Sequence, residues 1–448
     1  MENNTFDRRD FLKLSTSTLG GIGMTGIDFG GLILPKNLIQ NASADKPVRL
    51  GFIGVGGRGS YHLDCALGIE GVEVPAVCDI NVSRLERAGK WIEESGRAKP
   101  KLYSGATDYL KVCSEQQLDA IICSTPWDLH APICIAGMKN GKHVVSEVPI
   151  ILTVEEAWEI VETYEKTGKW ATIGLEGFGE PAVLNMIQKG VLGDIIHAET
   201  GYIHDLRRVK FDPEEEPWRL QHAIDRNGNL YPDHPMNKLL PALEINHGDR
   251  MDFLVSMSSK SVMINEYAAK NFGADSKYAK IKTKLGDYNA TLIRTVNGKM
   301  ITLNHDTHTP HPRESYRVQG TKGVYLGDKD SKRIYLDGIS PKHDEWEPAD
   351  KYLKEYEHAM TKNYNPPPRK GGATRGHGGN STQTPIVWHR LVMALRENKM
   401  PDWDVYDSVT SSVISPLTEA SVANKCRPVD FPDFTKGKWK NRAPIALA

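Results

Sequence analysis

The stretch LGFIGVGGRGSYH, Leu50 to His62, joins an apolar run to a glycine-rich turn and the start of a helical segment. The turn reads Gly54-Val55-Gly56-Gly57-Arg58-Gly59. In such a turn the first glycine permits a tight bend, the second lets the backbone approach a pyrophosphate, and the third allows close contact between helix and strand. Asp79 follows Gly59 by 20 residues, at the end of the next apolar run. A carboxylate there accepts hydrogen bonds from ribose hydroxyls and repels a 2′-phosphate, so the stretch predicts an NAD site. The alternative is a flavodoxin-like fold whose turn binds no nucleotide.

Outward from this turn, apolar runs alternate with helical patterns. Strands are expected at 48–53, 72–77, 118–124 and 143–146, and helices at 60–69, 82–95, 131–139 and 154–167. This alternation predicts an N-terminal Rossmann domain over 46–173, with a doubly wound parallel sheet. Alternating runs at 197–202, 290–296 and 300–305 predict a C-terminal substrate-binding α+β domain over 174–448, with a mostly antiparallel sheet. The fold class is therefore α/β.

Composition narrows the class of partner. A chain of 448 residues suits two domains. Its formal net charge of −1 implies no strongly basic face, so neither nucleic acid nor an anionic membrane is expected as a partner. The six cysteines form no CxxC pair, and five lie in apolar or helix-like segments of the first third. They are interpreted as buried thiols of a chain that folds in a reducing compartment.

The N-terminus carries a different signal. Arg8 and Arg9 precede a weakly apolar run to about residue 34, and Asn41-Ala42-Ser43-Ala44 ends in an A-x-A pattern. Residues 1–44 resemble a twin-arginine (Tat) export signal, which implies the Tat machinery as a partner, a periplasmic or exported protein, and no integral membrane span in the mature form. The Tat pathway carries folded proteins, so NAD would be acquired before export. The alternative is an exposed arm with a chance Arg-Arg pair, and Asp28 within the apolar run favours it.

Two further turns resemble the Gfo/Idh/MocA oxidoreductase superfamily. They are Ser124-Thr125-Pro126-Trp127-Asp128-Leu129-His130 and Ser146-Glu147-Val148-Pro149. Members carry a TP…H turn and an EKP tripeptide at these places. The resemblance implies cofactor contacts from Trp127, His130, Glu147 and Val148. Trp127 either packs on the nicotinamide or fills the crevice between the domains. In typical dehydrogenases of the superfamily the EKP lysine polarises the substrate hydroxyl, and Val148 has no charge or hydrogen-bond donor.

The second half is similar to glycoside hydrolase family 109, the NAD-dependent exo-acting α-N-acetylgalactosaminidases. The shared segments include Gly201-Tyr202-Ile203-His204-Asp205-Leu206-Arg207, Trp218-Arg219 and Tyr231-Pro232-Asp233-His234. This family also pairs a Tat signal with the Gfo/Idh/MocA fold and has EV in place of EK. The resemblance implies a small glycoside as substrate, contacted by Tyr202, Arg219, Tyr231 and His234. Relatives often pair through the second-domain sheet, which leaves a homo-oligomer open.

Three departures from the family fall at the sugar site. Pro235-Met236-Asn237-Lys238 replaces a glycine-rich turn, and His247 stands where an arginine is usual. The tyrosine of the family's Pro-Tyr-x-Arg segment has no clean match in residues 310–316. We keep His247 as a substrate-contact candidate. The departures leave the identity of the sugar open.

The chemistry expected of such a site differs from that of glycosidases with two carboxylates. Oxidation of the sugar's C3 hydroxyl acidifies the C2 hydrogen, elimination expels the group at C1, water adds, and the ketone is reduced again. Tyr231, His234 and His204 are the candidate acid and base groups, each worth roughly 10²–10⁴-fold in rate. His204 has the alternative of a core histidine. No metal site is expected, because His247 and Glu244 have no third ligand and the His305/His308/His311 segment is interrupted by prolines.

Two other functions stay open on the sequence alone. One is a sugar dehydrogenase or 3-keto-glycoside-forming oxidoreductase of the same fold. The other is a non-catalytic sugar-binding protein. The segment HPMNKLL, which begins at His234, differs from the family pattern at the sugar pocket, so neither function is excluded.

Overall fold

The glycine-rich turn connects β1 (Val48–Ile53) to α2 (Gly57–Leu67), as the sequence predicts. The computed structural model describes residues 46–175, 177, 179–313, 316–328, 331–362 and 384–445. The predicted export segment 1–44 and the glycine-rich segment 376–379 lie outside the described residues.

Six parallel strands form the first sheet, in the order β3-β2-β1-β4-β5-β6. Besides β1 they are β2 (Val72–Cys78), β3 (Lys101–Tyr103), β4 (Ala120–Cys123), β5 (His143–Ser146) and β6 (Ala171–Thr172). The helices are α2, α3 (Val82–Glu94), α4 (Tyr109–Ser114), the 3-10 helix η1 (Trp127–Leu129), α5 (His130–Lys139) and α6 (Val154–Thr167). Every residue of β4 and β5 is buried, as expected for a parallel sheet covered on both faces.

Local signals fix the ends of the best-predicted helix. At α6 the Thr153 side chain accepts a hydrogen bond from the Glu156 amide, and the Glu156 carboxylate accepts one from the Thr153 amide. This capping box starts the helix, and Gly168, with a φ of +67°, ends it. The observed bounds match the predicted range 154–167.

The second sheet has nine strands, in the order β14-β13-β12-β11-β7-β10-β9-β8-β15. They are β7 (Ile195–Ile203), β8 (Met251–Ser258), β9 (Asn289–Thr295), β10 (Met300–Asp306), β11 (Tyr316–Gly320), β12 (Gly323–Gly327), β13 (Lys332–Leu336), β14 (Glu347–Pro348) and β15 (Val429–Asp430). All neighbouring pairs are antiparallel except β7 and β10. That parallel pair brings the segments after Ile203 and Asp306 to one edge of the sheet.

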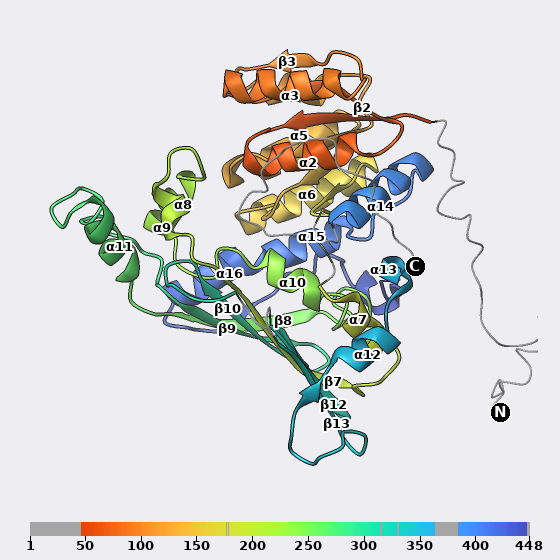
Figure 1. Cartoon of the computed structure of the whole chain (residues 1–448), viewed down its shortest axis with the longest axis vertical. Coiled ribbons are helices and arrows are strands. Elements are labelled where there is room, and N and C mark those ends of the chain that lie inside the picture. The colour runs from red at the N-terminus through yellow and green to blue at the C-terminus, as the bar shows by residue number, and fades with distance from the viewer. Residues whose placement is uncertain are drawn as a thin grey trace, which may run out of the picture. The chain divides into compact units, whose positions relative to one another are not determined.

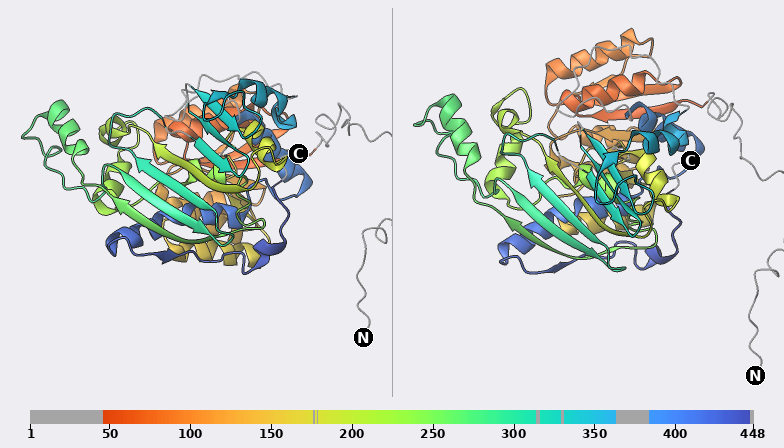
Figure 2. Two further views of the ribbon diagram at one scale, coloured as in Figure 1. Left: turned by 90° about the horizontal axis from the view of Figure 1, so that it is seen from below. Right: turned by 60° about the horizontal axis from the view of Figure 1, so that its bottom comes forward.

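The remaining helices follow β6 in the chain; some of them pack on this sheet, and others return to the first. They are α7 (Pro181–Gln188), α8 (Arg207–Phe211), α9 (Trp218–Asp225), α10 (Asp233–Leu239), α11 (Met263–Phe272), α12 (Asp350–Glu355), α13 (Ala359–Lys362), α14 (Thr384–Glu397), α15 (Val405–Ser412), α16 (Ile414–Ala423) and the 3-10 helix η2 (Lys438–Asn441). α10 packs on β7 and α16 on β8, whereas α14 packs on α2 and β1 (Figure 1). Figure 2 shows the strands of the second sheet in front of α16.

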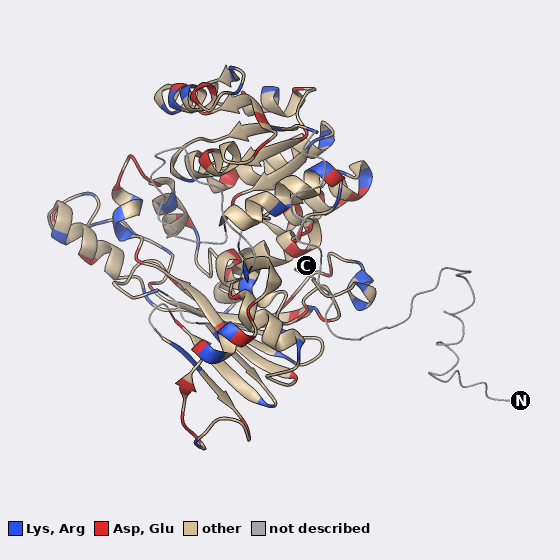
Figure 3. Cartoon of the chain, turned by 45° about the vertical axis from the view of Figure 1, so that its right-hand side comes forward, with Lys and Arg blue, Asp and Glu red and all other residues tan. Residues whose placement is uncertain are grey.

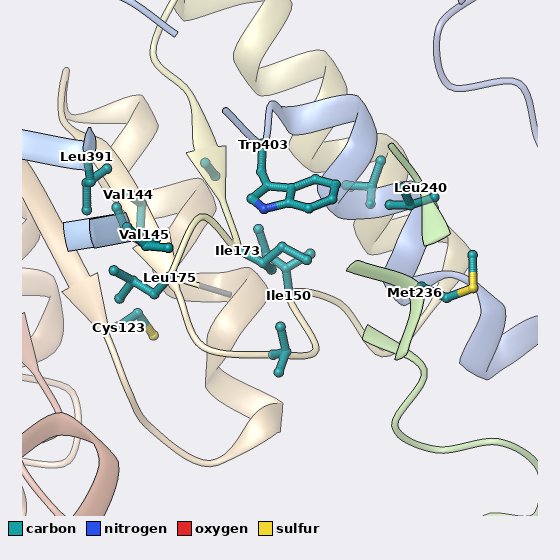
Figure 4. Close-up of a cluster of buried hydrophobic side chains, with 14 of the residues drawn as sticks. Cys123, Val144, Val145, Ile150, Ile173, Leu175, Met236, Leu240, Leu391 and Trp403 are labelled. Carbon is teal, nitrogen blue, oxygen red and sulfur yellow. The ribbon is translucent and has the colours of Figure 1, made fainter. Parts of the chain in front are cut away.

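A continuous core joins the two sheets. Figure 4 shows Trp403 beside Ile173, with Ile150 from the turn after β5 and Met236 and Leu240 from the α10 region. Polar bonds cross the same region: the Ile150 amide donates to Ser412 Oγ at 3.0 Å, and the Ser412 hydroxyl donates to Asp233 Oδ1 at 2.6 Å. The helix that bears His234 is thereby tied to the first sheet.

The surface and the thiols agree with the composition. Acidic and basic residues alternate along the helices and strands in Figure 3. All six cysteines are free thiols, and five are buried, as predicted. Within the described ranges, no helix combines the length and the apolar character that crossing a membrane requires.

Candidate active site

In the glycine-rich turn, Gly54 and Gly59 are tightly packed against backbone, whereas Gly57 borders open space that could hold a phosphate. A Cβ on Gly54, whose φ is +85°, would lie 2.4 Å from the Ser124 carbonyl oxygen, and one on Gly59 would lie 2.0 Å from the Gly54 oxygen. A Cβ on Gly57, the first residue of α2, would meet nothing within 4 Å. The close contacts hold the strand, turn and helix together, while the helix N-terminus faces open space. This arrangement fits a pyrophosphate.

Asp79 is oriented by the same turn. Its Oδ2 accepts a hydrogen bond from the Val55 amide at 2.7 Å, and its Oδ1 accepts one from the Asn81 amide at 2.8 Å. Two backbone donors therefore hold the carboxylate beside the glycine-rich turn at the end of β2. A carboxylate in this position suits the ribose hydroxyls of NAD.

His130 joins the turns that follow β4 and β5. Its Nδ1 lies 2.7 Å from the Pro149 oxygen, and its Nε2 lies 2.8 Å from the Thr125 oxygen. Burial lowers the pKa of His130, and the two carbonyl contacts oppose that effect. Because both ring nitrogens face backbone carbonyls, His130 braces the two turns against each other, and its predicted contact with the cofactor stays a prediction.

Glu147 links the β5 turn to the dinucleotide turn. Its Oε1 lies 2.5 Å from His62 Nε2 and 3.5 Å from Arg58 Nε. Burial by itself raises the pKa of Glu147, but the Arg58 charge and the His62 hydrogen bond outweigh it and hold the pKa well below its ordinary value. Val148 is 2% exposed and contributes an apolar wall where the superfamily pattern has a lysine.

Residues from four segments meet in an aromatic cluster next to this turn. Tyr231 stacks on Trp127 of η1, with ring centroids 5.2 Å apart, and meets His234 edge-on at 4.7 Å. Tyr202, near the end of β7, stacks on His234 at 5.4 Å. The Arg219 guanidinium lies 4.9 Å from the ring centroids of both Trp127 and Tyr231. The structure thus brings four predicted substrate residues together, and Trp127 packs against them.

Local sequence explains how Tyr231 and His234 reach the cluster. Pro232 precedes α10, and Pro235 lies in its first turn, where a missing amide hydrogen removes no helical bond. His204, one residue beyond β7, joins through its Nδ1, which lies 3.1 Å from the Tyr202 hydroxyl. Its amide donates to the Asp306 oxygen at 2.8 Å.

Burial sets the protonation of the cluster. It raises the pKa of Tyr231 well above the ordinary value, and the Arg219 charge only partly offsets this. Burial disfavours the Arg219 charge, but Glu216, which pairs with it, and the neighbouring tyrosines raise its pKa overall. Tyr231 is therefore a neutral phenol and Arg219 a fixed cation at neutral pH.

His247 is not part of this cluster. Its Nε2 lies 3.2 Å from Asp407 Oδ2, its Nδ1 lies 2.5 Å from the Ala443 oxygen, and Arg442 joins the same group. Burial lowers the pKa of His247, but Asp407 outweighs it, so the pKa is raised. The position suits a structural ion pair, and the predicted substrate contact finds no support in it.

Sequence reasoning missed several buried groups near the cluster. Lys210 of α8 donates to Thr307 Oγ1 at 2.8 Å, and burial lowers its pKa well below the ordinary value. His305 pairs with Tyr202 in the parallel register, and their rings stack at 6.4 Å. The sequence predicts a strand at 300–305 that contains His305, but only the pairing of β7 with β10 shows that His305 lies beside Tyr202. No set of three metal-ligating side chains occurs in the part of the chain that the structure describes.

Comparison with known proteins identifies the family. Residues 48–175 match the "Oxidoreductase family, NAD-binding Rossmann fold", and residues 179–441 match "Glycosyl hydrolase 109, C-terminal domain". A "Glycosyl hydrolase family 109 protein" of Shewanella sp. (strain W3-18-1) is 38% identical, with 98% of each chain covered. A "Glycosyl hydrolase family 109 protein 1" of Shewanella sp. (strain MR-4) gives the same identity and coverage.

Solved structures agree on the fold. An oxidoreductase domain protein from Kribbella flavida superposes with a TM-score of 0.66 at 17% identity, covering 87% of this chain and 100% of that one. Levoglucosan dehydrogenase, in complex with NADH and levoglucosan, gives 0.63 at 18% identity with the same coverage. An inositol dehydrogenase homolog from Azotobacter vinelandii, complexed with NAD+, gives 0.62 at 18%, covering 86% and 98%. The predicted fold class, resemblance and cofactor are confirmed. The full-length relatives and the two family matches show that this chain belongs to glycoside hydrolase family 109 and is an NAD-dependent, sugar-active enzyme.

Proposed function

We propose that this protein is an exported glycosidase that removes terminal α-linked N-acetylgalactosamine and keeps its NAD as a recycled catalyst. The observation that carries the proposal is the junction of two sites. The cluster of Tyr202, Arg219, Tyr231 and His234 packs on Trp127, three residues after Ser124, whose carbonyl abuts Gly54 of the dinucleotide turn. Glu147 contacts Arg58 of the same turn. A sugar held by the cluster is thus next to the cofactor.

Bound NAD supplies a hydride acceptor for the C3 hydrogen and returns the hydride in the last step, so the cycle has no net redox change. The chain's own groups move the protons. Tyr231, kept as a neutral phenol by burial, is suited to donate a proton from its oxygen to the leaving group. His234, packed between the rings of Tyr231 and Tyr202, is the candidate base for the C3 hydroxyl and the C2 hydrogen.

Two further groups complete the proposed site. The fixed cation of Arg219 supplies positive charge for the enolate oxygen that forms when the C2 proton leaves. His204 shares a hydrogen bond with the Tyr202 hydroxyl and is the alternative proton acceptor. The apolar Val148 offers no charge of its own to a substrate hydroxyl.

The test begins with folded protein purified without added cofactor. Denaturation and quantification of released NAD give the cofactor content, and p-nitrophenyl glycosides, starting with α-N-acetylgalactosaminide, are assayed with no NAD supplied. Stoichiometric NAD, aglycone release and no net NADH are expected. NADH that accumulates in proportion to substrate without aglycone release would instead establish the dehydrogenase. Bound NAD without turnover of any glycoside would favour a sugar-binding protein.

Export is proposed from residues 1–44 alone. Fractionation of the native host should place the protein in the periplasm or beyond, and replacing Arg8 and Arg9 by lysine should retain it in the cytoplasm. A cytoplasmic wild-type protein would remove this part of the proposal and leave the glycosidase assay unaffected.

A further inference from the structure

Two buried side chains and one partly buried carboxylate, from distant parts of the chain, form a hydrogen-bonded line. Trp388 of α14 is 0% exposed, and His62 of α2 is 2% exposed. The Trp388 indole nitrogen lies 3.2 Å from His62 Nδ1, and His62 Nε2 lies 2.5 Å from Glu147 Oε1. The line ends at a carboxylate that also contacts Arg58 of the dinucleotide turn at 3.5 Å.

The chemistry of the indole fixes the proton on His62. An indole N–H only donates, so His62 Nδ1 must accept and carries no proton. A neutral imidazole then has its single proton on Nε2, which donates to Glu147. As long as Trp388 occupies Nδ1, His62 cannot take a second proton there. Glu147 therefore faces a neutral donor and keeps its full negative charge.

The negative charge of Glu147 lies where it can act on the nicotinamide ring of a bound cofactor. Arg58 and His62 approach Glu147 from α2 and its N-terminus, and His234 of α10 acts on it from the aromatic cluster. Glu147 therefore lies where the dinucleotide site meets the sugar cluster. Hydride transfer between cofactor and sugar requires the nicotinamide ring at this junction. The oxidised ring is positively charged and the reduced ring is neutral, so a nearby anion stabilises the oxidised form.

We propose that Trp388 and His62 are positioning residues that hold Glu147 as an oriented carboxylate and thereby make the site favour NAD+ over NADH. The proposal rests on NAD binding and is independent of the sugar proposed above. It gives the protein a way to return its cofactor to the oxidised state after each cycle. The positive charge of Arg58, 3.5 Å from Glu147, opposes this in part and is the same in every variant tested below, and the neutral Val148 adds no further positive charge.

The indole N–H can be removed while the ring is kept. Trp388 also stacks on Phe52, with ring centroids 6.4 Å apart and planes 10° apart, so Trp388→Phe preserves an aromatic ring in the core. In this variant Nδ1 is released and can hold a proton of its own, so that His62 carries two protons beside Glu147. The pair then carries no net charge. Trp403→Phe is the matched control, because Trp403 is also 0% exposed and its carbonyl accepts from Thr172.

The first experiment is nitrogen NMR of ¹⁵N-histidine-labelled holoenzyme, with the His62 signals assigned by their loss in His62→Gln. At pH 6 wild type should show the Nε2–H tautomer, and so should Trp403→Phe. Trp388→Phe should show protons on both nitrogens at the same pH. Two protons on His62 in wild type, or a proton on Nδ1, would overturn the proposal.

The second experiment is a reductive titration of bound NAD in the holoenzyme, followed by its absorbance. At pH 6, Trp388→Phe should lose about tenfold in the preference for NAD+, which is a rise of about 30 mV for a two-electron couple. The double variant Trp388→Phe/His62→Gln should return to the wild-type potential, because a glutamine amide donates to Glu147 and gains no proton. Equal potentials in wild type and Trp388→Phe, or a double variant that stays shifted, would refute the role of His62.

Discussion

Gly59→Ala tests whether the dinucleotide turn is as tightly built as the contacts indicate. The new Cβ would lie 2.0 Å from the Gly54 oxygen and 2.8 Å from its carbonyl carbon, and both are backbone atoms that no rotamer change can move. The turn has to shift by about 1.4 Å to reach an ordinary contact of 3.4 Å, and overpacking of this kind costs about 3 kcal/mol. The shift also displaces the helix N-terminus that faces the pyrophosphate, so NAD content should fall with stability.

Gly57→Ala is the matched control, because its Cβ meets nothing within 4 Å. It lies at the start of α2, where alanine favours the helix by about 0.5–1 kcal/mol over glycine, so the fold should be retained. Thermal unfolding and the NAD released on denaturation are measured for both variants. With roughly 2.1 cal/mol/K of unfolding entropy per residue, 3 kcal/mol lowers the Tm by about 3 °C. A Gly59→Ala protein with wild-type Tm and full NAD content would refute the reasoning.

Three other predictions concern pH, catalysis and the core. Burial lowers the pKa of both His143 and His308 to about 4, against about 6.5 in an unfolded chain. Between these two pKa values the unfolded state binds more protons than the folded state. The free energy of unfolding therefore decreases as the pH is lowered through this window, by about 2 kcal/mol per histidine at pH 5. Equal urea midpoints at pH 7 and pH 5 would contradict this. Tyr231→Phe should lower kcat on the glycoside by at least roughly 10²-fold with NAD content unchanged, and a loss under threefold would exclude Tyr231 as the proton donor. Trp403→Ala, which empties the core between the sheets, should cost about 4 kcal/mol in denaturant unfolding, and an unchanged midpoint would show that this core is not continuous.

The first sheet could be predicted because its signals are local. The glycine turn, the capping box at Thr153 and the buried runs of β4 and β5 each specify their own conformation. The sequence missed β3 and β6, which have three and two residues and carry no pattern long enough to read. The parallel pairing of β7 with β10 was also beyond prediction, because strand order depends on packing between segments about 100 residues apart.

In the candidate site, too, residues of one local motif could be predicted, whereas contacts between distant segments could not. Tyr231 and His234 lie in one short motif and were predicted, whereas His62 and Trp388 are separated by 326 positions and meet only in the folded chain. The TP…H turn, which His130 closes, predicts a cofactor contact from this residue. Its two backbone partners, Thr125 and Pro149, became visible only once the turns were placed side by side.

The return of α14 to the first sheet has a consequence for synthesis on the ribosome. Residues 48–175 contain the whole dinucleotide motif, yet Phe52 of β1 and His62 of α2 are completed by Trp388. A nascent chain that has emerged only as far as β6 exposes this face of β1 and lacks the donor that orients His62. The hydrogen bond that orients His62 therefore forms only after nearly the entire chain has been made, although the dinucleotide motif is made first.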